Sequence, residues 1–332
     1  MNVTPEHVQK TLLSNGSCFE NQQTDSEKDS LVTFTVLPDQ SGMRLDKYLS
    51  EQSTGLTRSY LQKLIKDKMV TLNGADGKAG VKLSAGDVIR LSIPEAVELE
   101  VLPEDIPLDI LYEDQDVIVI NKPKGMVVHP GAGHYSGTVV NALLFHCKGE
   151  LSGINGVLRP GIVHRIDQNT TGSLVICKND AAHNCLARQL KEHTITRRYR
   201  AIVHGRLSED GVIHTTIGRH PVKRREMAAN VPNGKHAVTH YHVLETFDQF
   251  TYIECVLETG RTHQIRVHMK SIGHPVLGDD VYGPSRCPFP ALQGQTLHAM
   301  TLGFIHPSTK RYVEFEAPLP DYFEALLHKL RH

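Results

Sequence analysis

Short β-type segments dominate the chain from about residue 109 onwards, and they do not alternate regularly with helices. The segments with strand character are DVIVIN, GSLVICK, RYRAIVHG, HAVTHYHVLE, TYIECVLE, LHAMTLGFI and RYVEFEA. Helical periodicity is confined to residues 137–146, 180–193, 261–272 and 321–330, with Asp180 as the expected cap of the second helix. A regular alternation would indicate a parallel sheet. This order instead predicts an α+β domain over residues 109–332, with a mainly antiparallel sheet and flanking helices.

A smaller module precedes that sheet. Two sets of apolar residues have the spacing of a buried helix face, and they are Leu45, Tyr48 and Leu49, then Leu61, Leu64 and Ile65 behind the expected cap Thr57. The segments MVTLNG and DVIRLSIP read as strands of a small hairpin, with an Asn-Gly turn after the first. We therefore expect a two-helix plus hairpin domain over residues 32–94, which is too small to hold a full enzyme cleft.

Composition characterises the remaining segments. Residues 1–31 are polar with little apolar periodicity, and they predict a disordered or loose tail. Residues 95–108 are acidic and contain prolines, which is typical of a linker. Hydrophobic residues make up 39% of the chain and charged residues 22%. These proportions exclude a wholly disordered chain, a coiled coil and a collagen.

The sequence predicts a cytoplasmic protein with no membrane partner. No apolar run approaches the roughly 20 residues of a membrane-spanning helix. The first residues, MNVTPEHVQK, lack the basic region and the apolar core of a signal peptide. The six cysteines are far apart and form no CxxC pair, so we expect reduced thiols rather than a zinc ribbon or a redox couple.

The net charge of -1 conceals an uneven distribution of charge. Residues 188–225 carry ten Lys and Arg against three acids, and residues 44–68 carry six against three. Residues 95–116 between them carry nine carboxylates and no Lys or Arg. Two basic patches separated by an acidic stretch fit a defined anion-binding face, but they also fit an ordinary solvated surface.

The densest polar motif is GIVHRIDQNTTGSLVICK at residues 161–178. An apolar strand leads into His164, Arg165 and Asp167, and a polar turn then closes at Gly172 before another apolar strand. A carboxylate on a loop between core strands is well placed for nucleophilic or acid–base chemistry. The residues alone leave a second interpretation open, in which Asp167 only forms an Asx-type turn.

Two further motifs carry clustered polar residues. If residues 261–272 are helical, His263, Arg266 and Lys270 share a polar face, which could meet phosphates or a catalytic carboxylate, or could simply be solvated. In RRYRAIVHG, strand alternation directs Tyr199 away from the arginines on either side of it, toward the other face of the sheet. That position suits an ordinary core tyrosine equally well.

HRIDQNTTG, RRYRAIVHG and TGRTHQIRVH have the order and spacing of the three signature segments of the RluA/RluD family of pseudouridine synthases, which the chain resembles. NKPKGMVVHPGAG at residues 121–133 and HPVKRREMA at residues 220–228 make it most similar to the RluD branch. The module GMRLDKYLSEQSTGLTRSYLQKLIKDKMVTLNG is similar to the S4 RNA-binding domain. The resemblance covers roughly residues 33–328.

This resemblance implies an enzyme that isomerises uridine to pseudouridine in large-subunit (23S) ribosomal RNA, on a uridine flipped out into a central RNA-binding cleft. No metal and no cofactor are implied. The resemblance makes Asp167 the catalytic aspartate, acting as nucleophile or base, with Tyr199 as the active-site tyrosine and Arg266 as the arginine that pairs with the aspartate.

RNA is the implied partner, either as free large-subunit ribosomal RNA or within an assembling large subunit, and a monomer is the default state. In the catalytic domain the expected RNA-binding residues are Arg165, His164, Arg261 and His263. In the small module, basic side chains are expected to contact phosphates without reading sequence, and these are Arg44, Arg58, Lys63 and Lys66.

Other functions remain open at this stage. A non-catalytic RNA-binding protein would keep the basic surfaces but would not need Asp167 together with Tyr199 and Arg266. A synthase acting on a different RNA would share every motif. A metal-dependent hydrolase is suggested by histidines spaced for one face of a strand, His236, His240 and His242, although no HExxH motif or cysteine cluster supports it.

Overall fold

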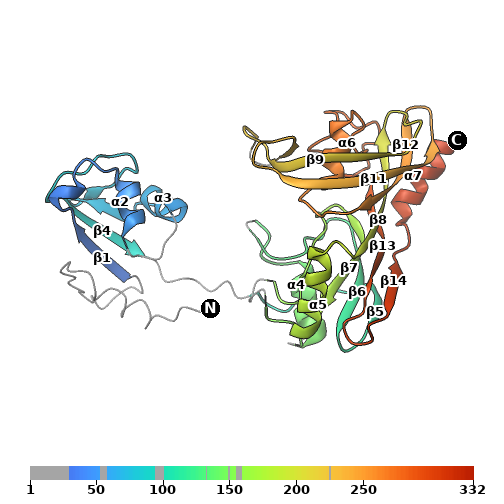
Figure 1. Cartoon of the computed structure of the whole chain (residues 1–332), viewed down its shortest axis with the longest axis horizontal. Coiled ribbons are helices and arrows are strands. Elements are labelled where there is room, and N and C mark those ends of the chain that lie inside the picture. The colour runs from blue at the N-terminus through green and yellow to red at the C-terminus, as the bar shows by residue number, and fades with distance from the viewer. Residues whose placement is uncertain are drawn as a thin grey trace. The chain divides into compact units, whose positions relative to one another are not determined.

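The computed structural model describes most of the chain, namely residues 30–52, 58–93, 101–131, 133–148, 150–154, 159–223 and 226–332. The chain divides into two compact units, Met1–Glu98 and Leu99–His332, which are described separately here (Figure 1). Most of the predicted tail and the expected cap Thr57 lie outside the described residues.

The first unit packs two helices on a four-stranded antiparallel sheet. The helices are α2 (Leu45–Glu51) and α3 (Arg58–Lys66). The strand order is β1–β4–β2–β3, with β1 (Ser30–Thr35), β2 (Val70–Leu72), β3 (Ala75–Asp76) and β4 (Val88–Ile93). Both predicted apolar helix faces are buried, as expected. Sequence analysis missed β1 and β3, and β1 pairs along its whole length with β4 from residue 30 onwards.

A buried carboxylate ties the two helices of the first unit together. Asp46 is fully buried, and it accepts hydrogen bonds from Arg44 Nε at 3.1 Å, Arg58 Nη2 at 2.9 Å and Gln62 Nε2 at 2.8 Å. Burial opposes ionisation of Asp46, but these hydrogen bonds outweigh it and hold the pKa of the carboxyl well below its usual value. Two of the expected phosphate contacts, Arg44 and Arg58, are therefore partly engaged within the protein.

The second unit is built on a ten-stranded sheet in which β14 pairs with β13 beside the main path. The path runs β10–β9–β11–β12–β8–β13–β7–β6–β5, and every pairing is antiparallel except β7 with β13. The predicted mainly antiparallel α+β architecture is confirmed. The strands are β5 (Ile110–Glu113), β6 (Val117–Lys122), β7 (Thr171–Cys177), β8 (Thr196–His204), β9 (Gly211–Arg219), β10 (Met227–Ala229), β11 (Lys235–Thr246), β12 (Phe250–Leu257), β13 (Leu297–Ile305) and β14 (Tyr312–Glu316).

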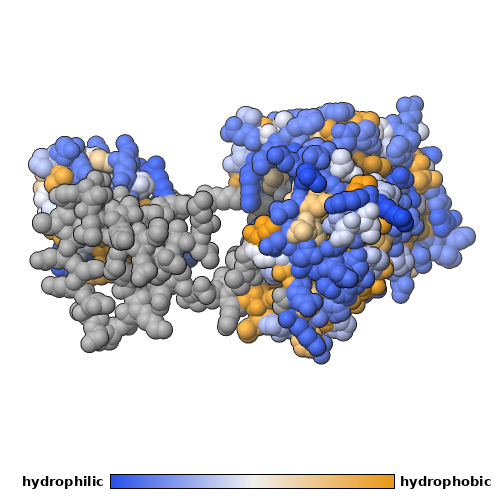
Figure 2. All heavy atoms as spheres, turned by 60° about the horizontal axis from the view of Figure 1, so that its bottom comes forward, coloured by the Kyte–Doolittle hydropathy of each residue, from blue (hydrophilic) through white to orange (hydrophobic). Residues whose placement is uncertain are grey.

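Helices α4 (Val139–Cys147), α5 (Asp180–Lys191), α6 (Gln264–Ser271) and α7 (Asp321–Arg331) match the four predicted helical segments. Helix α5 contacts β7 and β13, whereas α6 contacts β9, β10 and β11 (Figure 1). Among the helices of the described ranges, none is both long and apolar enough to cross a membrane. Hydrophilic side chains cover most of the face of the second unit drawn in Figure 2.

Two details of the helix predictions are wrong. The cap of α5 is Asn179, whose side chain accepts a hydrogen bond from Ala182 N, rather than Asp180. Helix α6 begins at Gln264 instead of residue 261, because His263 adopts a left-handed conformation with φ 56°. Of the three residues of the expected polar face, Arg266 is buried and His263 is half-buried, and Lys270 is exposed, so the face is only partly solvated.

The described part of the predicted linker, residues 101–108, packs on the second unit. Val101 is buried in an apolar cluster with residues of β6 and α4. The side chain of Asn141 donates a hydrogen bond to Leu102 O at 2.8 Å, and the carboxylate of Glu104 accepts one from Gly137 N at 3.1 Å. These contacts fasten the segment to the start of α4.

Replacing Asp46 with alanine leaves two arginines and an amide without their acceptor. We expect the free energy of unfolding of the first unit to fall by about 2 kcal/mol, since the arginines are half exposed and water replaces part of the loss. Hydrogen exchange of residues 30–93 in the full chain measures this.

The same carboxylate sets a pH dependence. Because the folded pKa of Asp46 is lowered, its stabilisation is present above the ordinary carboxyl pKa of about 3.9 and is lost as the pH falls below that value. The Asp46→Ala variant should lack this acid-dependent step. The matched control is the exposed neighbour Asp67→Ala, and equal stability of the two variants would contradict the assignment.

Candidate active site

The loop that precedes β7 presents Asp167 directly after two anchored residues. Ile162 forms a β-bridge with Ile176 of β7, and Ile166 is buried in the core cluster beneath β8, β12 and α6. The turn after Asp167 is closed by a backbone hydrogen bond from Thr170 N to Asp167 O at 3.0 Å. In the described parts of the chain, the side chain of Asp167 accepts no hydrogen bond from this loop. The Asx-turn interpretation is therefore wrong, and the carboxylate faces away from its own backbone.

Arg266 of α6 holds Asp167 from the other side of the site. Its Nη1 donates to Asp167 Oδ2 at 2.9 Å, while Nε and Nη2 donate to Asp279 Oδ2 and Oδ1 at 2.6 and 2.9 Å. Burial opposes the guanidinium charge, but Asp279 and then Asp167 outweigh it and raise the pKa of Arg266. The predicted pairing of Arg266 with Asp167 is thus present, and a second carboxylate that the sequence did not indicate supports it.

His263 and Tyr282 form a relay beside the same carboxylate. Tyr282 Oη accepts a hydrogen bond from Met227 N at 2.8 Å, and it lies 2.8 Å from His263 Nδ1. The hydroxyl can then donate to Nδ1, and in that arrangement the ring proton of a neutral imidazole lies on Nε2. Burial lowers the pKa of His263 and favours this neutral form. Nε2 lies 3.8 Å from Asp167 Oδ1.

A cavity of about 350 Å³ opens next to Asp167. Its apolar wall is made by Val163, Ile166, Leu190, Leu257, Ile265 and Leu297. All seven residues expected to act in this domain line it, namely Asp167, Tyr199, Arg266, Arg165, His164, Arg261 and His263. Pockets of a few hundred Å³ with convergent polar groups are typical small-molecule sites, and this one has room for a single nucleoside.

Tyr199 belongs both to the core and to the cavity. Its ring packs in the cluster that contains Ile166 and Ile265, and its residue is 9% exposed. Burial raises the pKa of the Tyr199 phenol, with the nearby Arg197 opposing the shift, so the hydroxyl is protonated at neutral pH. The Tyr199 side chain therefore forms a flat, uncharged part of the cavity wall.

A second hollow of about 370 Å³ shares Arg165, Asp167, His263 and Arg266 with the first. Its remaining walls include Val127, Val128, His129 and Gly131 of the NKPKGMVVHPGAG motif, and His134 just after it. Arg165 is exposed, and its Nη1 lies 3.4 Å from His129 Nε2. Asp167 thus lies in a wall that two hollows share.

Lys122 is a residue of the site that sequence analysis missed. It is fully buried, and its Nζ donates to the carbonyls of Pro123, Met126 and Gln168 at 2.7, 2.8 and 3.0 Å. Burial lowers the pKa of Lys122 to about 7, and the charge of Asp167 opposes that shift. Lys122 fastens the 123–126 turn to the residue after Asp167. The lysine directly after the apolar segment VIVIN was the signal in the sequence that could have indicated this residue.

Two of the expected RNA-binding side chains are partly engaged by the protein itself. His164 Nε2 accepts a hydrogen bond from Val175 N at 3.1 Å, and burial lowers the pKa of this imidazole to about 3. The neutral imidazole ring of His164 therefore anchors this loop to β7. Arg261 Nε donates to His236 O at 2.9 Å. In the first unit, Lys63 and Lys66 are exposed.

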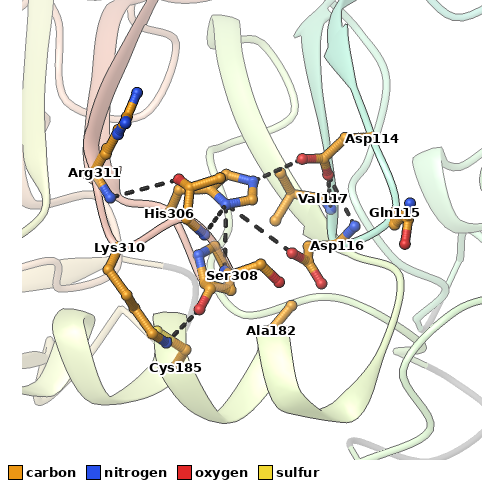
Figure 3. Close-up of polar contacts among 12 residues, drawn as sticks. Asp114, Gln115, Asp116, Val117, Ala182, Cys185, His306, Ser308, Lys310 and Arg311 are labelled. Atoms are coloured by element: carbon orange, nitrogen blue, oxygen red, sulfur yellow. Dashed lines mark hydrogen bonds and ion pairs between the residues drawn. The ribbon is translucent and has the colours of Figure 1, made fainter.

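Asp114, Asp116 and His306 are the one group of metal-ligating side chains gathered within 4.8 Å in the described ranges (Figure 3). His306 Nε2 donates to Asp114 Oδ2 at 2.7 Å, and His306 Nδ1 accepts from Ser308 N at 3.3 Å. Asp114 Oδ1 accepts from the backbone of residues 116 and 117. These contacts fasten two turns, and none of the three residues lines the cavity at Asp167.

The three strand histidines do not form a metal site. His240 Nε2 lies 2.6 Å from Glu258 Oε1, and His242 Nδ1 lies 2.9 Å from Asp210 Oδ2. His236 instead lies near His214, with their ring centroids 6.4 Å apart. Each ring thus has a different neighbour, and the hydrolase interpretation gains no support.

Comparison with known proteins agrees with this geometry. The RNA pseudouridylate synthase family matches residues 116–271, and the S4 domain matches residues 43–89. An uncharacterized RNA pseudouridine synthase of Bacillus subtilis, YlyB, is 52% identical over 90% of this chain and 98% of its own length. The ribosomal large subunit pseudouridine synthase D of Zymomonas mobilis is 47% identical over 89% of this chain and 96% of its own length.

Among solved structures, human RNA pseudouridylate synthase domain containing 1 matches with a TM-score of 0.53 and 27% identity. The match covers 71% of this chain and 97% of the human chain. The sequence identities to the bacterial proteins extend over both units. The chain therefore belongs to the RNA pseudouridine synthase family, and it is an RNA pseudouridine synthase with an S4 RNA-binding domain.

Proposed function

We propose that this enzyme isomerises uridine to pseudouridine in 23S ribosomal RNA, with Asp167 as the residue that reacts with the ribose. The choice of target is supported by relatives named ribosomal large subunit pseudouridine synthase D, which are 44–47% identical over 89–98% of this chain. The enzyme would act as a monomer in the cytoplasm, on free ribosomal RNA or on an assembling large subunit.

The observation that carries the role of Asp167 is the unequal state of its two carboxylate oxygens. Oδ2 is held by Arg266, whereas Oδ1 has His263 at 3.8 Å and no closer side-chain partner in the described parts of the chain. Asp167 lines a cavity with room for one nucleoside. An oriented carboxylate with one open oxygen is what a reaction at the sugar requires.

The reaction begins with a uridine that leaves its base stack and enters the cavity, at a cost of a few kcal/mol. The N-glycosidic bond then breaks, the uracil turns, and C5 rejoins the ribose. Ionised Asp167 either attacks the sugar carbon or removes a ribose proton, and Arg266 fixes its orientation in both routes. Tyr199, as a neutral phenol, supplies a face on which the flipped base stacks.

Basic side chains around this cavity would offset the cost of base flipping. Arg165 is exposed in the wall between the two hollows and is free to meet a phosphate of the flanking RNA. In the S4 domain, Lys63 and Lys66 are the most available phosphate contacts because Arg44 and Arg58 already pair with Asp46. Such contacts position RNA and leave sequence selection to the cavity.

Asp167→Asn should abolish the isomerisation while RNA binding persists. The amide keeps the size of the side chain but cannot attack carbon or accept the ribose proton, so activity should fall by at least about 10⁴-fold. Tritium release from C5-labelled uridine in 23S ribosomal RNA and in immature large subunits measures activity, and filter binding measures affinity. Tritium release by the variant at the wild-type rate would show that Asp167 is not a catalytic residue. Release by the wild type only from another RNA would disprove the target.

Asp279→Asn should lower kcat and leave the KM for RNA nearly unchanged. Asp279 touches Arg266 rather than substrate, so its loss misorients Asp167 by way of the guanidinium, and a fall of about 10–100-fold in kcat is expected. The exposed Asp248→Asn is the control. A rise in KM with unchanged kcat would show that Asp279 supports RNA binding instead.

Lys63→Gln combined with Lys66→Gln should weaken RNA binding without changing kcat at saturating RNA. Two lost phosphate contacts should reduce the slope of log affinity against log salt by about 1.5. The substitution Lys329→Gln in α7, which removes one exposed positive charge from the second unit, serves as the control. An unchanged salt slope in the double variant would exclude these lysines from the RNA interface.

A further inference from the structure

Arg197 is a buried cation without an anionic partner. It is the second residue of β8, it is 7% exposed, and it lines the cavity next to Asp167. Its Nη2 donates to the backbone carbonyl of Glu258 at 3.0 Å, while its buried Nε has no hydrogen-bond partner. Across the described ranges, no carboxylate lies within ion-pair distance of Arg197. An uncompensated buried charge is costly unless a ligand completes it.

The backbone around Arg197 leaves room for its guanidinium at the cavity wall. A Cβ atom added to Gly260 would lie 2.6 Å from Arg197 Nη1, which is closer than any real Cβ contact. Gly260 also lines the cavity. A glycine at this position therefore leaves space for the Nη1 end of the Arg197 side chain, whereas a larger residue would displace it.

The charges nearby do not neutralise this group. Arg261 is another cation in the same wall, and it lowers the pKa of Arg197 further after burial has lowered it. Arginine stays protonated in proteins in spite of such shifts. At the other end of the site, Arg266 is balanced by Asp167 and Asp279. The cavity wall thus has a surplus of positive charge at Arg197 and Arg261.

We propose that Arg197 binds a carbonyl oxygen of the uracil ring and stabilises the negative charge that develops there when the base leaves the ribose. This role rests on the proposed function. As the N1–C1′ bond breaks, its electron pair stays on N1 and is delocalised onto the ring carbonyl oxygens. The electron pair that the ribose loses is replaced either by a new bond from Asp167 to the sugar carbon or by the pair freed when a ribose proton passes to Asp167. Both routes release uracil as an anion, so both need a cation at the base.

The position of Arg197 along β8 assigns it to the base rather than to a phosphate. Arg197 and Tyr199 are two residues apart in a strand, so their side chains share one face of the sheet. The charges of Arg197 and Asp167 both act on the Tyr199 phenol. If the ribose lies at Asp167 and the base stacks on Tyr199, the carbonyl oxygens of the base are on the side of Arg197.

The test compares two leaving groups. Fluorine at C5 makes uracil a better anion, so RNA that contains 5-fluorouridine needs less help from a cation when the glycosidic bond breaks. Arg197→Gln should slow consumption of uridine at saturating RNA by about 10²–10³-fold, the usual effect of removing one donor to developing charge. The same variant should slow consumption of 5-fluorouridine by a clearly smaller factor. Single-turnover reactions followed by mass spectrometry of the digested nucleosides measure both rates.

Two further variants make the outcome decisive. Gly260→Ala keeps the arginine but displaces its guanidinium, so it should show the same leaving-group dependence even if Arg197→Gln does not fold. The exposed neighbour Arg198→Gln should change neither rate. Equal slowing of both substrates by Arg197→Gln or Gly260→Ala would overturn the proposal and assign Arg197 to a phosphate or to the scaffold. Failure of the wild type to convert uridine would instead overturn the proposed function.

Discussion

The site depends on a buried arginine held between two carboxylates. Arg266 and Asp279 satisfy each other through two hydrogen bonds, and Asp279 also accepts from the backbone of Val281 and Tyr282 at 3.0 Å. That arrangement leaves a single guanidinium nitrogen for Asp167. Arg266 therefore orients Asp167 while Asp279, on a different segment of the chain, holds the guanidinium in place. Removing either acid would leave Arg266 as an underpaired buried charge.

The sequence predicted most elements of the fold because their patterns are local. Strands such as β6 and β13 are apolar runs, and the helix faces of the small unit repeat every three to four residues. Strand β9 was missed because GVIHTTIGR mixes exposed and buried positions without clean alternation. The start of α6 was misplaced because His263 adopts a left-handed conformation, which the local sequence pattern does not reveal.

The site was predictable in its residues but not in its connections. Sequence analysis named seven side chains that line one cavity, because three motifs carried them together. It left a solvated face on α6 open as one alternative, but Arg266 is buried and its charge is balanced by acids outside the helix. Asp279 and Lys122 were not found, because each acts through partners that only the folded backbone brings near. Local sequence patterns indicate which residue types are present, but they do not reveal which side chains far apart in the sequence form pairs.

The charge next to Asp167 at neutral pH is carried by arginines and aspartates. Its two central imidazoles are neutral, since burial lowers the pKa of His164 to about 3 and also lowers that of His263. Both rings act through fixed hydrogen bonds, His164 to β7 and His263 to Tyr282. Positive potential is therefore concentrated on Arg165, Arg197 and Arg261, which have no carboxylate partners in the described ranges, while Asp167 is screened by Arg266. A polyanion is attracted to the first group without competing for the second, so binding of RNA and orientation of the reactive carboxylate rely on different charges.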